Sequence, residues 1–134
     1  MKFILDTNIC IYLIKKKPVQ VFEKFKELPL GSIGISSITL AELQYGIEKS
    51  TQQDKNQFAL NQFLLPLEVL DFNSEAAIEY GKIRTYLERN GLPIGSLDML
   101  IAAHTKTLGL TLVTNNEKEF VRIEGLKVEN WVKE

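Results

Sequence analysis

The first eight residues contain the feature that most constrains the fold: three apolar residues that run into a carboxylate. Phe3–Leu5 are followed at once by Asp6, Thr7 and Asn8, residue types that begin helices. A short buried strand that turns directly into a helix is typical of α/β folds, and open α/β sheets bind their ligands where such strands end. Asp6 therefore has two interpretations, as the N-cap of the next helix or as part of a binding site.

Short apolar runs alternate with helical patterns along the rest of the chain. Residues 33–36, 67–70 and 110–114 predict further strands, and residues 126–128 predict a short fifth one. Strands separated by helices favour a parallel sheet with helices on both faces. We therefore predict one domain, residues 1–134, with a three-layer α/β/α architecture around a central, mainly parallel sheet of four or five strands. The predicted helices cover residues 8–17, the stretch after Pro18, the stretch containing Leu40, Leu43 and Ile47, residues 53–65, the stretch from Ser74 to Asn90, and the stretch from Ser96 to Gly109, with Ser74 and Ser96 as N-caps.

Composition places the chain among ordinary globular proteins and excludes several classes. Of its 134 residues, 45% are hydrophobic and 25% are charged, and the net charge of −1 gives no overall basic field for nucleic acid. Lys15–Lys17 form a local basic patch, which suits either a helix C-terminus or contacts with phosphates.

The single cysteine, Cys10, excludes an internal disulfide and is predicted to pack in the core. No apolar run suits a signal peptide or a membrane helix, so we expect a cytoplasmic protein without membrane association.

Acidic and amide side chains follow several of the predicted strands. Asp6 ends the first strand and Glu42 lies early in the helix after the second. Asn116 and Glu119 follow the fourth strand, and Asp98 lies in the first turn of the helix before it. Because the carboxyl ends of parallel strands meet at one edge of the sheet, we expect these side chains to gather there.

Each acid also has a purely structural alternative. Glu42 lies three residues after Thr39, and Glu117 lies three after Thr114, and both are capping-box spacings. Asp98 suits the positive end of a helix dipole. These alternatives explain single residues, but not why three or four acids occupy equivalent places on successive units. The repeated placement favours a shared acidic site.

A group of carboxylates without thiol or imidazole partners points to a hard divalent cation. Like charges repel one another, and a metal ion relieves that repulsion. Oxygen ligands favour Mg²⁺ or Mn²⁺, which hold phosphates and activate water for in-line attack. Zinc does not suit a chain with one Cys and one His, and His104 lies on an apolar helix stripe that predicts a packed, hydrogen-bonded core residue. The chain has neither a Gly-x-Ser-x-Gly elbow nor a phosphate-binding glycine loop, so metal-dependent phosphodiester hydrolysis remains.

Five segments carry a recognisable combination of residues. They are Leu5–Asn8, Ser36–Gly46, Asp98 with Ile101–Ala103, Leu112–Phe120 and a closing Val128–Trp131. In order and spacing they resemble the PIN-domain nucleases, and more closely the VapC toxins of bacterial type II toxin–antitoxin systems. The resemblance extends over nearly the whole chain.

The resemblance implies a Mg²⁺- or Mn²⁺-dependent endoribonuclease that cleaves RNA, often tRNA in toxins of this type, and so arrests translation. It also implies a homodimer inhibited by a small VapB-type antitoxin, whose C-terminal tail lies across the acidic site. Operator DNA would be contacted only through the antitoxin, in a higher assembly of both proteins. Two alternatives stay open: a non-catalytic PIN fold that binds RNA or protein, and a PIN nuclease of RNA maturation.

The site residues of the family fall on acidic and small polar positions of this chain. The resemblance assigns the metal to Asp6 and Asp98, with Glu42 completing the acidic site. Many PIN domains have an aspartate where Asn116 stands, so Glu119 is the candidate for the fourth acidic position of the site. The expected catalytic set is thus Asp6, Glu42, Asp98 and Glu119, and the groups expected near the phosphate are Thr7, Asn8, Thr114 and Asn116, with Thr7 and Asn8 also expected to cap the first helix and leave Asp6 free.

Overall fold

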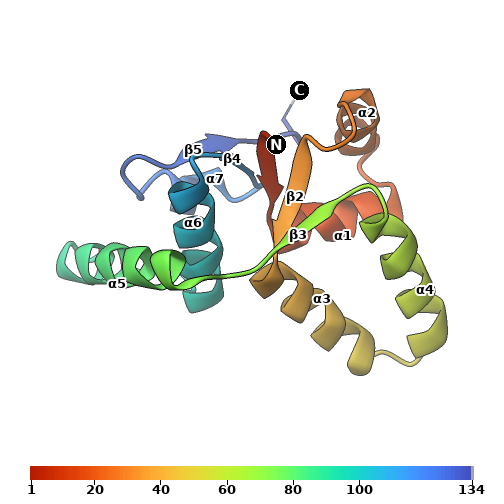
Figure 1. Cartoon of the computed structure of the whole chain (residues 1–134), viewed down its shortest axis with the longest axis horizontal. Coiled ribbons are helices and arrows are strands. Elements are labelled where there is room, and N and C mark those ends of the chain that lie inside the picture. The colour runs from red at the N-terminus through yellow and green to blue at the C-terminus, as the bar shows by residue number, and fades with distance from the viewer. Residues whose placement is uncertain (134) are drawn as a thin grey trace.

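A computed structural model describes residues 1–133, and a five-stranded sheet lies at its centre (Figure 1). Its strands are β1 (Phe3–Leu5), β2 (Ile33–Ser36), β3 (Glu68–Leu70), β4 (Thr111–Val113) and β5 (Lys127–Glu129). They are ordered β3-β2-β1-β4-β5, and every neighbouring pair is parallel. Because β1 is the central strand, the residue that follows it emerges in the middle of the carboxyl edge.

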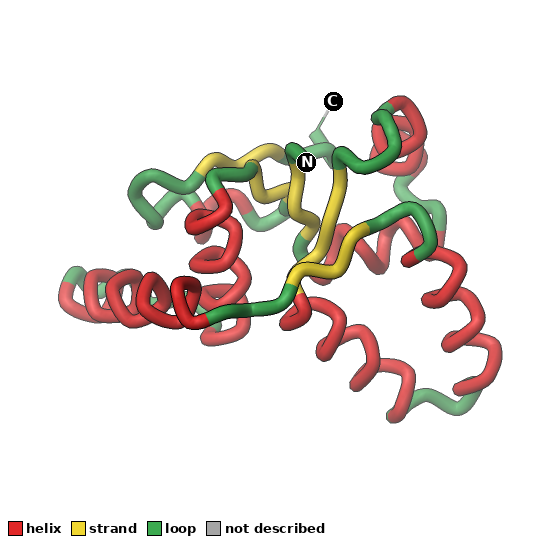
Figure 2. Tube along the Cα trace, viewed as in Figure 1, coloured by secondary structure: helices red, strands yellow, loops and turns green. Residues whose placement is uncertain are grey.

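Helices cover both faces of the sheet, which confirms the predicted three-layer α/β/α architecture (Figure 2). Most of the first half of the chain packs on one face, and the second half supplies the other (Figure 1). The first face carries α1 (Thr7–Lys15), α2 (Val19–Glu27), α3 (Ser37–Glu48) and α4 (Gln53–Leu64), whereas the second carries α5 (Ser74–Arg89), α6 (Ser96–Leu108) and the short α7 (Glu117–Phe120).

Successive residues of the central strand point to opposite faces and join two separate cores. Phe3 and Leu5 pack in the cluster formed with α1 to α4, whereas Ile4 packs in the cluster formed with α5 and α6. Burial on both faces explains why β1 is an unbroken apolar run rather than an alternating one. Cys10 is fully buried in the first cluster, as predicted.

The observed helix caps differ from the predicted ones. Asn73 caps α5 through its Oδ1, which accepts a hydrogen bond from the Ala76 N–H at 3.0 Å, so the prediction of Ser74 as the cap is wrong. Gly95 is the N-cap of α6, and Ser96 is its first helical residue. Asn73 and Ser74 are equally good capping types, and the extended backbone of Asn73 decides between them. Within the described residues, each helix is too short or too polar to span a bilayer.

Candidate active site

Asp6 lies at the junction of β1 and α1 and is 5% exposed. Its Oδ1 accepts a hydrogen bond from the Ile9 N–H at 2.9 Å, so Asp6 itself caps α1. The expectation that Thr7 and Asn8 would cap this helix is therefore wrong. A carboxylate has about four acceptor positions, so one capping bond leaves room for other partners. The N-cap interpretation of Asp6 is thus confirmed, and its place in a binding site stays a prediction.

Glu42 reaches back to the first turn of α1. The Thr7 hydroxyl donates a hydrogen bond to Glu42 Oε1 at 2.6 Å, across 35 residues of sequence. The predicted capping box between Thr39 and Glu42 does not form, because Ser36 caps α3 by accepting from the Ile38 N–H at 3.1 Å. Thr39 is fully buried instead, and within residues 1–133 its Oγ1 has no hydrogen-bond partner.

The electrostatics of Asp98 bring the four predicted acids together. The pKa of Asp98 is raised to about 6, mainly by burial and then by the charges of Asp6, Glu119 and Glu42, in that order of strength. The pKa of Asp6 is also raised, mainly by burial and partly by the charge of Glu42, although a hydrogen bond with Thr114 opposes the shift. These couplings act only over short distances. Asp6, which follows β1, and the acids of α3, α6 and α7 therefore lie close enough together to form one acidic site.

The segment after β4 contributes the remaining predicted residues of the acidic site. Thr114 is fully buried, and its Oγ1 accepts a hydrogen bond from the Asn116 N–H at 2.9 Å. Asn116 is the N-cap of α7, and the half-buried Glu119 lies on that helix. The alternative of a capping box between Thr114 and Glu117 is wrong, because the Glu117 carboxylate pairs with Lys133.

The donor set suits a hard divalent cation that keeps part of its hydration shell. Within residues 1–133, no three Asp, Glu, His or Cys side chains are arranged as a complete metal-ligand set. Mg²⁺ is commonly held by one or two carboxylates, with waters and substrate phosphates in the other positions, so Asp6 and Asp98 fit that requirement. His104 is 2% exposed and hydrogen-bonded within the core, as predicted, and does not belong to the site.

Comparison with known proteins identifies the family. A family model described as "PIN domain" matches residues 3–126. The chain is 47% identical over 131 residues to the tRNA(fMet)-specific endonuclease VapC of Shigella flexneri, covering 98% of each protein. It is 49% identical over 134 residues to the ribonuclease VapC2 of Rickettsia felis, covering 99% of this chain and 100% of that protein. The chain belongs to the VapC group of the PIN-domain family.

The fold of this PIN domain is also that of solved VapC structures. Superposition on the crystal structure of VapBC2 from Rickettsia felis, bound to a DNA fragment from its promoter, gives a TM-score of 0.92 at 48% identity. The match covers 98% of this chain and 99% of that chain.

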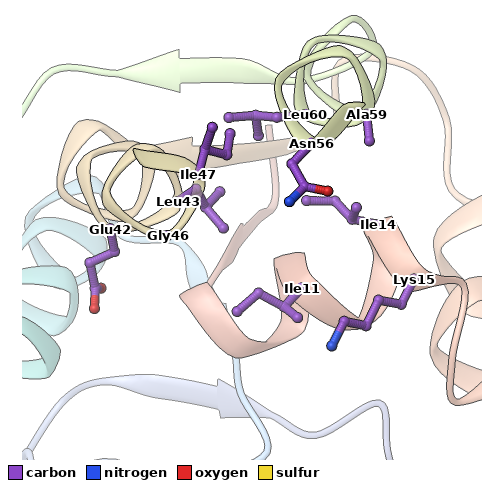
Figure 3. Close-up of a pocket in the computed structure, with 10 residues that line it drawn as sticks. All are labelled: Ile11, Ile14, Lys15, Glu42, Leu43, Gly46, Ile47, Asn56, Ala59 and Leu60. Carbon is purple, nitrogen blue, oxygen red and sulfur yellow. The ribbon is translucent and has the colours of Figure 1, made fainter. Parts of the chain in front are cut away.

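A cavity of about 270 Å³ adjoins the acidic site of the PIN domain, between α1, α3 and α4. Apolar side chains such as Ile14, Leu43 and Leu60 line its interior, and Glu42 and Lys15 lie on different sides of it (Figure 3). Lys15 is the last residue of α1, so the basic patch does end a helix, as one of its two interpretations predicts. Sequence patterns identify these apolar residues only as core, because the spacing of three helices is not a local property.

Removing the Thr7 hydroxyl is expected to slow RNA cleavage by this PIN domain about tenfold, which corresponds to about 1.4 kcal/mol and to one hydrogen bond with a charged group. Thr7→Val keeps the shape of the side chain but leaves Glu42 Oε1 without its donor. Thr7→Ser keeps the hydroxyl and is the matched control. Initial cleavage rates at saturating Mg²⁺ test the prediction, and equal rates for the Val and Ser variants would contradict it.

Proposed function

We propose that this protein is a divalent-metal-dependent endoribonuclease and the toxin of a VapBC-type toxin–antitoxin pair. The observation that carries the proposal is the convergence of Asp6, Glu42, Asp98 and Glu119 on one acidic site, where burial and then the charges of the other three acids raise the pKa of Asp98. Such a site gains by binding a cation and has the oxygen donors that Mg²⁺ or Mn²⁺ prefers. The names of its VapC relatives, a ribonuclease and a tRNA(fMet)-specific endonuclease, support RNA as the substrate class.

Asp6 and Asp98 are the residues that would hold the metal. When bound, Mg²⁺ or Mn²⁺ supplies charge neutralisation for the scissile phosphate and lowers the pKa of water. Glu42 is the general base or orienting group for the attacking water, and its Oε1 is fixed by the Thr7 hydroxyl. Glu119 rather than Asn116 supplies the fourth acidic corner, since the charge of Glu119 acts on Asp98 and an amide carries none.

The small polar residues have different roles in this proposal. Thr114 is buried and hydrogen-bonded with Asp6, so it supports that carboxylate and does not reach RNA itself. Thr7 supports Glu42 in the same way. Asn8 is exposed in the first turn of α1, and the half-buried Asn116 begins α7, so these two amides are the groups available to the RNA backbone beside the acids.

The partners in this proposal are a VapB-type antitoxin, a second copy of the chain and RNA. The apolar cavity beside Glu42 suits a short apolar segment of the antitoxin, whose tail would then cross the acidic site. The VapBC2 complex of Rickettsia felis is bound to promoter DNA, which supports a higher assembly that contacts operator DNA through the antitoxin. Cellular RNA as substrate implies that the protein acts in the cytoplasm.

Incubation of total RNA with the purified protein, followed by mapping of the new ends, tests the proposed function. We expect a small number of discrete cuts with Mg²⁺, none in EDTA, and none with Asp6→Asn. The mapped ends identify the target RNA and the cleaved bond. RNA binding without cutting would instead favour the non-catalytic alternative, and cutting that persists in EDTA would overturn the metal assignment.

A further inference from the structure

One buried hydrogen bond connects the two helices that carry acids of the site from opposite faces of the sheet. His104 Nδ1 of α6 lies 2.8 Å from the Oγ of Ser36, the last residue of β2 and the N-cap of α3. His104 is 2% exposed and Ser36 is fully buried. The two residues are 68 positions apart in the sequence, so the bond belongs to the tertiary structure alone.

The direction of this bond follows from the other partners of Ser36. The Ser36 Oγ accepts from the Ile38 N–H at 3.1 Å, and within residues 1–133 its other hydrogen-bond partner is His104 Nδ1, so pairing the buried hydroxyl proton requires Ser36 to donate to Nδ1. Nδ1 is then an acceptor, and the imidazole is neutral with its proton on Nε2. Burial lowers the pKa of His104 against the raising effect of the Asp71 charge, which agrees with a neutral ring.

Packing holds the imidazole in place from a third element. The Phe72 ring meets the His104 ring edge to face, with centroids 5.5 Å apart. The Phe72 N–H in turn donates to Ser37 Oγ at 3.0 Å, which ties the end of β3 to the start of α3. The junction of β2 and α3 is therefore fixed to both α6 and β3 through groups that are at least partly shielded from water.

The bond lies between the two helices that carry Glu42 and Asp98. Glu42 is six residues after Ser36 along α3, and Asp98 is six residues before His104 along α6. At about 1.5 Å per residue, each carboxylate lies about 9 Å along its helix from the bond. Both helices extend in the same direction past the sheet edge, α3 away from β2 and α6 with its first turn foremost (Figure 1). The Ser36–His104 bond thus sets the distance between the parts of α3 and α6 that carry Glu42 and Asp98.

We propose that His104 is a positioning residue for the acidic site, because its bond to Ser36 fixes α6 against α3 and hence Asp98 against Glu42. This inference rests on the proposed function. Each carboxylate lies about 9 Å from the bond along its helix, so a rotation of one helix by about 6° displaces its carboxylate by about 1 Å. A misplacement of that size costs on the order of 10²-fold in rate. Loss of the buried acceptor would therefore affect the chemistry more than the fold.

The test compares His104→Phe with Thr105→Val. The first variant keeps a ring for packing against Phe72 but removes the acceptor for the Ser36 proton. Thr105 is the next residue of α6, is fully buried, and donates only to the Ile101 carbonyl of its own helix at 2.8 Å, so its Val variant is the matched control. His104→Asn, which restores an amide oxygen near the position of Nδ1, is the rescue variant. Each is characterised by its thermal unfolding midpoint, its Mn²⁺ affinity from calorimetry, and its kcat and KM on RNA.

We expect His104→Phe to lower kcat about 10- to 100-fold with little change in KM, and to weaken Mn²⁺ binding about tenfold. Thr105→Val should keep wild-type kcat and Mn²⁺ affinity while its unfolding midpoint falls about as much as that of His104→Phe. The kcat and Mn²⁺ affinity of His104→Asn should recover to within about threefold of wild type.

Equal Mn²⁺ affinity and kcat in His104→Phe and Thr105→Val would overturn the inference. If His104→Phe does not fold, a folded His104→Asn without recovered Mn²⁺ affinity would overturn it. A wild-type protein that binds Mn²⁺ but cuts no RNA would overturn the proposed function alone, because the Mn²⁺ affinities of the variants still test the positioning.

Discussion

Replacing Asp6 by Asn is expected to abolish Mg²⁺-dependent RNA cleavage while the protein remains folded. The substitution removes one of two proposed metal-binding carboxylates, and the loss should reach at least about 10³-fold, or about 4 kcal/mol of transition-state stabilisation. An amide oxygen still accepts hydrogen bonds but carries no charge to hold the cation. Cleavage of the mapped RNA bond, followed over time with Mg²⁺ present, measures the effect.

The Asp6→Asn variant should lose the carboxylate charge but keep the helix cap. Asn and Asp are equivalent N-caps, so the bond from the Ile9 N–H to Oδ1 should persist. The Asp6 carboxylate is also buried beside the charge of Glu42, and burial raises its pKa, so a neutral amide should unfold at the same temperature as wild type or higher when EDTA is present. Asp6→Ala loses the cap as well and should be about 1 kcal/mol less stable. Residual cleavage in a folded Asn variant would contradict the metal-binding role.

The second large effect concerns pH. We expect cleavage at limiting Mg²⁺ to fall about tenfold for each pH unit below about 6, because the proton and the metal compete for the Asp98 carboxylate. Excess Mg²⁺ should shift the midpoint of this fall to lower pH. A profile that stays flat between pH 4 and 7 at limiting Mg²⁺ would contradict the assignment of Asp98, and the RNA itself is checked by incubation without protein.

The same group should make the metal-free protein less stable as pH rises. The pKa of Asp98 is about 6 in the folded state, against about 3.9 in an unfolded chain, so the folded state binds more protons between those values. The free energy of unfolding is therefore highest below about pH 4 as far as this group is concerned, and it falls as pH rises through about 6. The raised pKa of Asp6 acts in the same direction.

Thermal unfolding in EDTA between pH 4 and 8 measures this effect. Asp98→Asn should flatten the dependence and unfold at a higher temperature than wild type at pH 8, and Mg²⁺ should stabilise wild type at that pH but not the variant. If Asp98→Asn is less stable than wild type at pH 8 in EDTA, the ionised Asp98 carboxylate does not destabilise the folded state, and the prediction is contradicted.

Much of the fold and of the candidate site is predictable from local patterns. The apolar run of β1 and the helical stripes that follow it are sufficient for a parallel three-layer fold. The places of Asp6, Glu42 and Asp98 on successive units are sufficient to predict one acidic edge, because parallel strands all end on the same side. Even the burial of His104 follows from its position on an apolar stripe.

Only the tertiary structure decides which partner each polar group takes. The caps were mispredicted at Asp6, Asn73 and Gly95 because adjacent residues have similar capping propensities, and the backbone angle that selects one depends on how the strand enters the helix. The bonds from Thr7 to Glu42 and between Ser36 and His104 cross 35 and 68 residues. Such bonds depend on the distance between packed helices, which is set by side-chain volumes in two cores and is not encoded in any local pattern.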